Sequence, residues 1–285
     1  MGEDGLEAAD LDAYFARIGH GGPSGADLET LTALHLAHPS AIPFECLDPF
    51  LSRPVRLDPA ALQAKLLAAR RGGYCFEQNG LLRRVLETLG FRVTPLAARV
   101  RWKLPDDAPR TPLTHMLLKI DLPEGPYLAD VGFGGQSPTA PLKMEPGQEQ
   151  ATSHGAYRLM PAGDGVTELQ TRLPGRAPDD WQAMHRFTLE PQGPEDYETY
   201  SWRTSTHPAS RFTSNLIASR VVGEARVNLM NRERTTRWPD GRTEHAILAD
   251  AAALGEVLAR DFGLDLDAAD INAIDARLPP AEPAA

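Results

Sequence analysis

The sequence predicts an α+β protein made of three consecutive units, and three observations lead to this expectation. Up to Gly90, apolar residues recur at helical spacing between turn signals. After Gly90, apolar residues alternate with polar ones in short runs separated by loops rich in Pro and Gly, which is typical of antiparallel strands. Beyond about residue 195 both patterns occur. We therefore assign a helical bundle to 1–90, a β unit to 91–194, and a linker with a mixed unit to 195–285.

Four helices are expected in the first unit. The third lies in LDPAALQAKLLAARRGG, where Asp58 is placed to cap the helix and Pro59 to occupy its first turn. Gly72 and Gly73 end it, so Cys75 stands at the start of the fourth helix, CFEQNGLLRRVLETLG. The other two helices are expected from Leu11 to the turn string GHGGPSG and over 26–36.

Short strands are expected in the second unit, where they form a small antiparallel barrel or sheet. They are FRVTPLAARVRW, THMLLKID, PYLADVGF, AYRLM, TELQTRL and MHRFTL, with LPEG as a hairpin turn between the second and the third. The segment PEDYETYSWRTSTHPASRF is expected to be a helix that leads to the third unit. That unit then contains strands in RFTSNLIASRVV and EARVNLM, a helix in LADAAALGEVLARDFGL, and a frayed tail, LPPAEPAA.

The bulk composition excludes several classes of protein. A net charge of -10, a pI near 5.3 and the lack of a long Lys/Arg run argue against a nucleic-acid binder. The acidic start, MGEDGLEAADLDAYF, is unlike a signal peptide, and no stretch of about 18 apolar residues predicts a membrane span. We therefore expect a cytoplasmic protein, in which Cys46 and Cys75 remain thiols.

Cys75 is a candidate nucleophile because a helix N-terminus and a nearby imidazolium are the usual means of stabilising a thiolate. A base and a group that orients the base would complete the set. His115 and Asp130 are candidates, because a hairpin centred near Leu122 and Pro123 places them opposite each other. Directly opposed Cβ atoms lie about 4.5–5.5 Å apart, which suits a hydrogen bond between His and Asp.

Other histidines are weaker candidates. His35 and His38 stand three apart on a helix, but no Cys or carboxylate follows at a spacing that completes a zinc site, so no metal is expected. His207 is expected to be structural, and the acidic run DLDAADINAIDA to be a solvated face.

The string RGGYCFEQN around Cys75 resembles the active-site signature of the arylamine N-acetyltransferases. Four further blocks resemble that family in the same order, from about residue 42 to 220. They are IPFECLD, THMLL, LADVGFGGQSPTAPL and STHPASRFTSNLIASR. One departure is Cys46, where the family's motif usually has Asn.

The resemblance implies a helical bundle that carries the nucleophile, a central antiparallel β-barrel, a C-terminal α/β lid and a papain-like triad of Cys75, His115 and Asp130. It also implies ligand contacts, which we expect from two groups of residues. The aromatic walls of the acceptor pocket would be Phe44, Phe133 and Phe212, and the glycines that admit the pantetheine arm would be Gly132, Gly134 and Gly135.

The activity implied is transfer of an acetyl group from acetyl-CoA, through a Cys75 thioester, to an arylamine or hydrazine by a ping-pong mechanism, with no metal. Two alternatives remain open. A transglutaminase- or protease-like cysteine hydrolase would use Cys, His and Asp in the same chain order, and a catalytically inactive CoA-binding protein would bind the ligand without acyl transfer.

Overall fold

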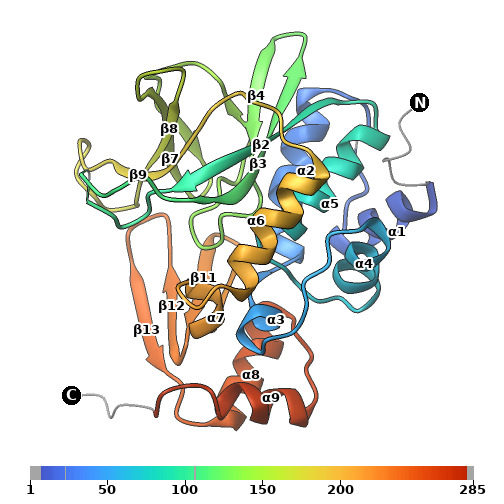
Figure 1. Ribbon diagram of the computed structural model, residues 1–285, viewed down its shortest axis with the longest axis vertical. Helices are drawn as coiled ribbons and strands as arrows, with labels where there is room; N and C mark the ends of the chain where they lie inside the picture. The colour runs from blue at the N-terminus through green and yellow to red at the C-terminus, as the bar shows by residue number, and fades with distance from the viewer. Residues whose placement is uncertain (1–7, 23, 106, 281–285) are drawn as a thin grey trace.

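The computed structural model describes residues 8–22, 24–105 and 107–280 (Figure 1). The acidic start and the end of the frayed tail, about which the sequence makes predictions, lie outside these residues. Within them, helices pack around two antiparallel sheets. The molecule is thus a mixed helix and sheet protein, as the sequence predicts.

The helices of the first unit form where the sequence signals place them. Asp58 caps the third by accepting a hydrogen bond from the Ala61 N–H at 3.0 Å, and Pro59 occupies its first turn, so that prediction is confirmed. The second helix runs to Ala41, five residues beyond the predicted end, because His38 in its last turn is held by side-chain hydrogen bonds from other elements. The segments are α1 (Ala8–Ile18), α2 (Leu28–Ala41), α3 (Leu47–Phe50), α4 (Pro59–Leu62), the π-helical segment Gln63–Ala68 and α5 (Cys75–Thr88).

The larger sheet curls into a nearly closed barrel. Its strand order among the described residues is β5-β4-β3-β2-β9-β8-β7-β6. The side chain of Gln150 on β6 joins the two ends, because it accepts from the N–H of Lys143 on β5 at 2.7 Å and donates to that residue's carbonyl at 2.8 Å. The strands are β2 (Arg92–Val100), β3 (Leu113–Leu122), β4 (Gly125–Ala129), β5 (Leu142–Lys143), β6 (Gln150–Thr152), β7 (Gly155–Pro161), β8 (Thr167–Arg172) and β9 (Gln182–Phe187).

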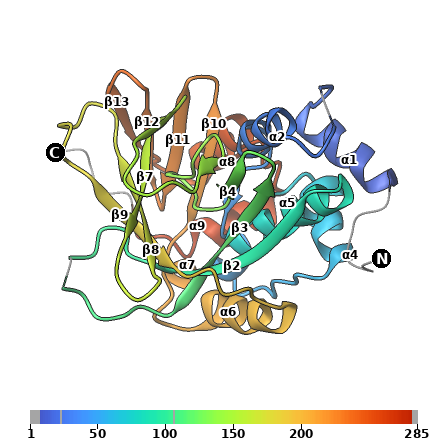
Figure 2. The same cartoon turned by 90° about the horizontal axis from the view of Figure 1, so that it is seen from above.

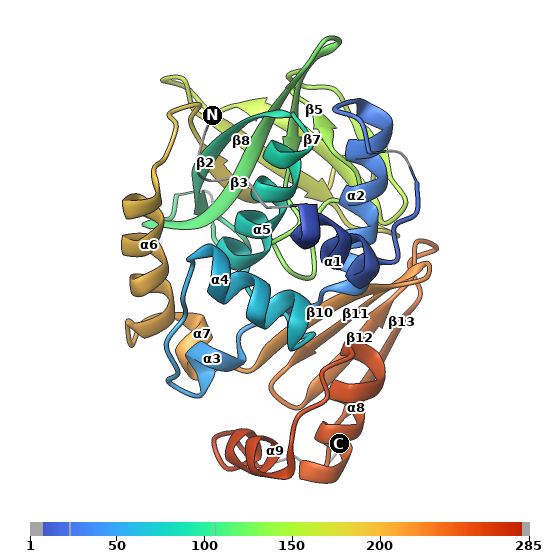
Figure 3. The same cartoon turned by 90° about the vertical axis from the view of Figure 1, so that its right-hand side faces the viewer.

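The smaller sheet has the order β1-β10-β11-β12-β13 among the described residues. Its edge strand β1 comes from the first unit of the chain, and Phe44 on β1 faces Ser219 on β10. The helices α8 and α9 lie at the end of the molecule away from the barrel (Figure 3). The elements are β1 (Phe44–Glu45), β10 (Ile217–Val222), β11 (Ala225–Met230), β12 (Glu233–Arg237), β13 (Thr243–Ile247), α8 (Ala251–Phe262) and α9 (Ala268–Asp275).

The segment after the barrel turns back onto the first unit. It forms the predicted helix α6 (Pro194–Thr206) and a short α7 (Arg211–Ser214). The Tyr197 hydroxyl donates to the Leu96 carbonyl oxygen on β2 at 3.0 Å, so α6 is fixed against the barrel, while α5 packs on β3 and β2 (Figure 2). Tyr197 consequently shares a hydrophobic core with Tyr74 and Cys75.

None of the helices in the described part of the chain has both the length and the apolar character needed to cross a membrane.

Candidate active site

Cys75 is the first residue of α5, and the two glycines before it let the chain reach that position. A Cβ on Gly72 would lie 2.1 Å from the Pro43 carbonyl oxygen, so only glycine fits there. Gly73 bridges to Phe44, and its carbonyl accepts the Glu45 N–H at 3.0 Å. The two glycines therefore let the segment before α5 pack directly against the backbone of β1.

A buried polar chain holds the same turn from the other side. Gln78 on α5 donates to the carbonyl oxygens of Pro43 at 2.7 Å and Gly73 at 3.1 Å. Its own carbonyl accepts from the Nε2 of His38 at 2.6 Å, and the His38 Nδ1 accepts from the Tyr14 hydroxyl at 3.0 Å. Burial lowers the pKa of His38 to about 3, which keeps the ring neutral. His38 is thus a structural histidine that positions the start of α5.

Buried charges surround the first turn of α5. Glu77 accepts the Tyr74 N–H at 3.0 Å and pairs with Lys65 at 2.6 Å. Lys65 also pairs with Asp48 at 2.6 Å. Burial raises the pKa of Glu77 to about 6 although Lys65 acts in the opposite direction. The first turn therefore combines a satisfied cap with a helix N-terminus, the end of a helix that favours an anion.

His115 and Asp130 meet as the sequence predicts, although not by direct opposition. The hairpin turn lies one residue later than expected, since Leu122 pairs with Gly125 and Leu118 with Ala129. Continuing this register places Asp130 two residues away from the position opposite His115. A shift of two residues keeps both side chains on one face of the sheet. The His115 Nε2 consequently lies 2.7 Å from the Asp130 Oδ2.

A β-bulge brings Cys75 into the group. Ala98 on β2 faces His115, but the next residue, Arg99, faces Leu113, so Thr114 is the extra residue of the bulge. The Cys75 Sγ lies 3.5 Å from the Thr114 carbonyl oxygen. Cys75 is also near enough to His115 to help raise the pKa of that imidazole. His115 therefore lies near Cys75 as well as Asp130.

Asp130 is fixed by several donors. Its Oδ1 accepts from the Asn79 Nδ2 and from the Gly132 N–H, both at 3.0 Å. Its backbone N–H donates to the Nε2 of His35 at 3.1 Å. Burial lowers the pKa of His35 to about 4, so this ring is a neutral acceptor. His35 therefore supports the backbone at Asp130.

The protonation states follow from the contact between His115 and Asp130. Burial by itself lowers the pKa of His115, but the charge and hydrogen bond of Asp130, helped by Cys75, raise it to about 10. Burial by itself raises the pKa of Asp130, but His115 and then His185 hold it well below its usual range. At neutral pH the pair is an imidazolium and a carboxylate. A charged imidazole beside Cys75 is the arrangement that stabilises a thiolate.

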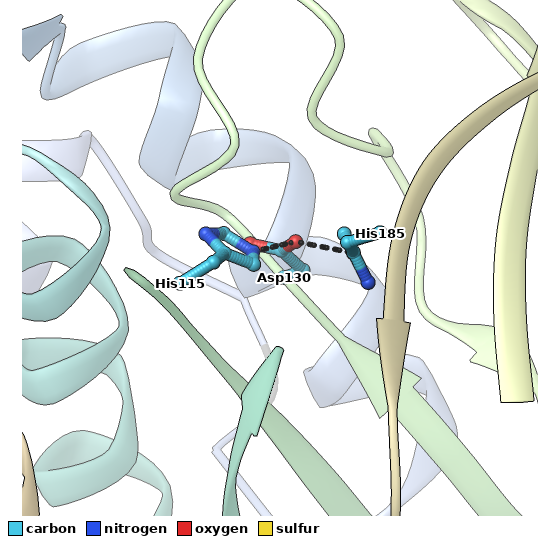
Figure 4. Close-up of side chains that lie close together, drawn as sticks. All are labelled: His115, Asp130 and His185. Carbon is cyan, nitrogen blue, oxygen red and sulfur yellow. Dashed lines mark hydrogen bonds and ion pairs between the residues drawn. The ribbon is translucent and has the colours of Figure 1, made fainter. Parts of the chain in front are cut away.

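His185 on β9 is a residue that the sequence analysis did not identify. It is fully buried, and its Nε2 lies 3.5 Å from the Asp130 Oδ2 (Figure 4). Its ring centroid is 5.0 Å from that of His115. Burial, opposed by Asp130 and reinforced by the charge of His115, lowers the pKa of His185. Asp130 thus lies between two histidines, one charged and one neutral.

Comparisons with known proteins show the family of the chain. A model of the N-acetyltransferase family matches residues 27–271. The arylamine N-acetyltransferase of Mycobacterium tuberculosis H37Rv is 45% identical over 275 residues, which cover 95% of this chain and 95% of that relative. The chain belongs to the arylamine N-acetyltransferase family. The Escherichia coli K12 member is 40% identical over 258 residues, 90% of this chain and 89% of that protein.

Solved structures of arylamine N-acetyltransferases share the fold. The enzyme from M. tuberculosis superposes with a TM-score of 0.88 at 44% identity, covering 94% of this chain and 100% of that one. The Mycobacterium marinum enzyme in complex with CoA gives a TM-score of 0.87 at 42% identity, covering 94% and 97%.

The three phenylalanines that the family resemblance assigns to the acceptor pocket lie in two places. Phe44 and Phe212 contact each other, with ring centroids 5.9 Å apart, and Phe212 also contacts Tyr74 at 5.8 Å. Phe133 stands edge-on to His115 at 5.1 Å and 5.4 Å from His185. Phe133 and Phe212 are half-buried, whereas Phe44 is 7% exposed and belongs to the core. Phe133 is therefore the one of the three that touches the charged pair.

The glycines around Phe133 are required by neighbouring protein atoms. A Cβ on Gly132 would lie 2.8 Å from the Cα of Cys75, and one on Gly135 only 2.0 Å from the Asn228 Oδ1. Gly134 has a positive φ of 78°. Gly134 and Gly135 also line, with Phe44, a cavity of about 10 Å³, which is room for one water molecule.

Cys46 joins the first unit to the smaller sheet. Its Sγ donates to the Asn215 carbonyl oxygen at 3.3 Å and accepts the Ile217 N–H at 3.2 Å. Burial raises the pKa of this thiol strongly. Cys46 is also the N-cap of the four-residue α3. An Asn side chain also carries both donors and an acceptor, so it can serve the same two backbone groups.

Proposed function

We propose that this protein is an acetyl-CoA-dependent N-acetyltransferase that carries the acetyl group on Cys75 and delivers it to an arylamine or hydrazine. The observation that supports it most is the position of His115, which lies near Cys75 and 2.7 Å from Asp130. That order of nucleophile, base and orienting carboxylate is the one that acyl transfer through a covalent intermediate requires. The named relatives are arylamine N-acetyltransferases.

The first half-reaction forms the acyl-enzyme. The Cys75 thiolate attacks the thioester carbonyl of acetyl-CoA, and the N–H groups at the start of α5 bind the oxyanion. The carbon–sulfur bond to CoA then breaks, and His115 gives its proton to the departing CoA thiolate. The exchange of one thioester for another is nearly balanced in energy, so the acetyl-cysteine can persist until an amine arrives.

The second half-reaction regenerates the thiolate. The amine nitrogen attacks the acetyl-cysteine carbonyl, His115 removes a proton from that nitrogen, and the carbon–sulfur bond to Cys75 breaks. Asp130 holds the Nε2 proton of His115, which leaves the Nδ1 free to act as the base. The two half-reactions share one site, as a ping-pong mechanism requires.

We assign the recognition of substrates to the loop at 132–135 and to the aromatic residues. Phe133, half-buried beside His115, would contact the ring of the amine, and Phe44 and Phe212 would complete the apolar wall. Gly132, Gly134 and Gly135 would let the pantetheine arm pass close to the backbone. The M. marinum relative, solved in complex with CoA, supports CoA as the product released.

The proposal also assigns a role to each of the three units of the chain. Residues 1–90 supply the nucleophile, 91–194 supply the base and its carboxylate, and 195–285 supply the linker and the lid. No metal takes part in the proposed steps. A cytoplasmic location fits the two free thiols, since a reducing compartment keeps Cys75 available.

Intact-mass measurement tests the proposal. Mixing the protein with acetyl-CoA and no amine should raise its mass by one acetyl group and release CoA, and adding an arylamine should restore the mass and give the N-acetyl product. Cys75→Ser should show neither change, whereas Cys46→Ser should behave like the parent protein. Acetylation that persists in Cys75→Ser would exclude Cys75 as the carrier.

The same samples separate the two alternatives. A cysteine hydrolase would release acetate without an amine and would cleave or transfer from peptide amides. An inactive CoA-binding protein would gain thermal stability with CoA but would keep its original mass.

A further inference from the structure

The ring of His185 has no role in the proposed reaction, although it lies beside Asp130. Its side chain is fully buried, and neither ring nitrogen has a hydrogen-bond partner among the described residues. A buried imidazole without partners is costly, since its desolvation is not offset. The Asp130 Oδ2 lies 3.5 Å from the His185 Nε2, beyond good hydrogen-bond distance. The ring therefore has one nitrogen lone pair and one N–H that no group among the described residues uses.

His185, Asp130 and His115 together form a set of metal ligands. One ligand atom from each of the three residues lies within 4.8 Å of the other two, and all three side chains are buried (Figure 4). Zinc takes nitrogen at about 2.0–2.1 Å and carboxylate oxygen at about 2.0–2.2 Å, so neighbouring ligands in a tetrahedral site lie roughly 3.3–3.5 Å apart. The 3.5 Å between His185 and Asp130 already has that length, and the 2.7 Å between His115 and Asp130 must lengthen by less than 1 Å.

The carboxylate is held in position for a cation. The Oδ1 of Asp130 is held by Asn79 and Gly132, so the Oδ2 stays aimed at the two rings. Metal ligands must be deprotonated, so binding has to displace the Nε2 proton of His115. Acetyl-CoA has to reach Cys75 beside His115 for the proposed reaction, so an ion can enter by the same route. Two His and one carboxylate leave a fourth position open.

We propose that His115, Asp130 and His185 bind one divalent transition-metal cation of the zinc type, and that this binding inhibits the enzyme without Cys75 as a required ligand. The ion replaces the Nε2 proton of His115, which leaves to solvent, and the lone pair of that nitrogen then goes to the metal. His115 can no longer be oriented by Asp130. Binding itself is independent of the proposed reaction, because it is measured without acetyl-CoA.

Zinc alone serves as the probe. Competition with a chromophoric chelator should show one tight ion per chain in the parent protein and in Cys75→Ser, with affinities within about threefold. His185→Gln keeps size and polarity but supplies a poor zinc ligand, so it should lose at least tenfold in affinity. The matched control is His154→Gln, which removes another buried histidine, one that contacts Thr139 and Gly223, and should not change binding.

Cobalt supplies an independent readout of the ligands. The Co²⁺ form of Cys75→Ser should retain the visible absorption of a tetrahedral site, and the parent should lack a strong thiolate-to-cobalt band. Loss of zinc binding in Cys75→Ser with normal binding in His185→Gln would establish a Cys-His site and overturn the proposal. Absence of tight binding to the parent would also overturn it. If His185→Gln fails to fold by circular dichroism, His185→Asn takes its place.

Discussion

Replacing Asp130 by Asn is the sharpest test of how the charged pair works. The substitution keeps the shape and lets Oδ1 continue to accept from Asn79 and Gly132. The new amide then turns its NH₂ toward the His115 Nε2, which must become an acceptor. The remaining proton of a neutral His115 would sit on Nδ1, facing Cys75, and the ring could not act as a base.

The size of the effect is expected from the tautomer that Asp130 enforces on His115. Asp130 is also the main cause of the rise in the pKa of His115 from the ordinary 6.5 to about 10. The same Asp-to-Asn change in a nucleophile–His–Asp triad lowers the rate about 10⁴-fold, which is about 5 kcal/mol. We therefore expect the acylation rate of Asp130→Asn at pH 7 to fall by roughly 10³–10⁴-fold.

The pH dependence has a definite sign. In the parent protein the imidazolium persists below a pKa of about 10, so the ion pair and the stability it contributes are fully present below pH 6.5 and are lost as the pH rises toward 10. In Asp130→Asn, burial is left as the leading influence and lowers the pKa of His115 below 6.5. The variant has no carboxylate at this position to form the ion pair, so its His115 should already be neutral at pH 7.

Rapid-quench mass spectrometry of acetyl-enzyme formation between pH 6 and 9 measures both effects. Asp121→Asn, an Asp in the same hairpin that is paired with Lys119 at 2.5 Å, is the matched control and should acylate normally. A folded Asp130→Asn with a rate near that of the parent would refute the reasoning and show that another residue orients His115. Loss of the fold would show that Asp130 is primarily structural.

Three other results are expected. Sub-stoichiometric iodoacetamide should label Cys75 before Cys46, whose thiol pKa is raised by burial, and Cys46→Asn should acylate nearly normally; prior labelling of Cys46 would show that the nucleophile is misassigned. Lys65→Met should cost about 3–5 kcal/mol of unfolding free energy at pH 7. That deficit should shrink at pH 5, because the raised pKa of Glu77 allows it to become neutral, and denaturant titration at both pH values checks this. Gly135→Ala should destabilise the protein by about 1–3 kcal/mol in thermal melts, since its methyl group would collide with an amide oxygen on β11, and an unchanged melting temperature would contradict the close approach.

The elements with strong local signals could be predicted from the sequence alone. Helix ends are marked by the backbone chemistry of Asp58, Pro59 and the Gly-Gly pair. The start of α5 at Cys75 could therefore be predicted. The alternating runs at β2, β3 and β4 gave the strands and placed His115 and Asp130 on one face. The prediction that both residues share a face was correct although the predicted hairpin centre was wrong. Side chains alternate between the two faces of a strand, so a register error of two residues leaves the face unchanged.

Elements whose residues lack a pattern of their own were not predicted. All five residues of β13 are exposed, so it has no apolar alternation, and β1 and β5 are two residues long. The run DLDAADINAIDA, expected only as a solvated face, contains α9, which buries Ile274. These segments adopt their conformation because they pair with a neighbouring strand or pack on a hydrophobic core that the rest of the chain forms.

The sequence by itself determined the helical, then stranded, then mixed succession, the family resemblance, and the candidate trio of Cys75, His115 and Asp130. Only the tertiary structure decided how these side chains meet, through the bulge at Thr114. It also brought His35 and His185 to Asp130 from positions 95 and 55 residues away along the chain. No local pattern marks such residues, because a buried histidine looks the same in sequence whether its partner is a backbone amide, a carboxylate or nothing. Its role is set by the atoms that folding places beside it.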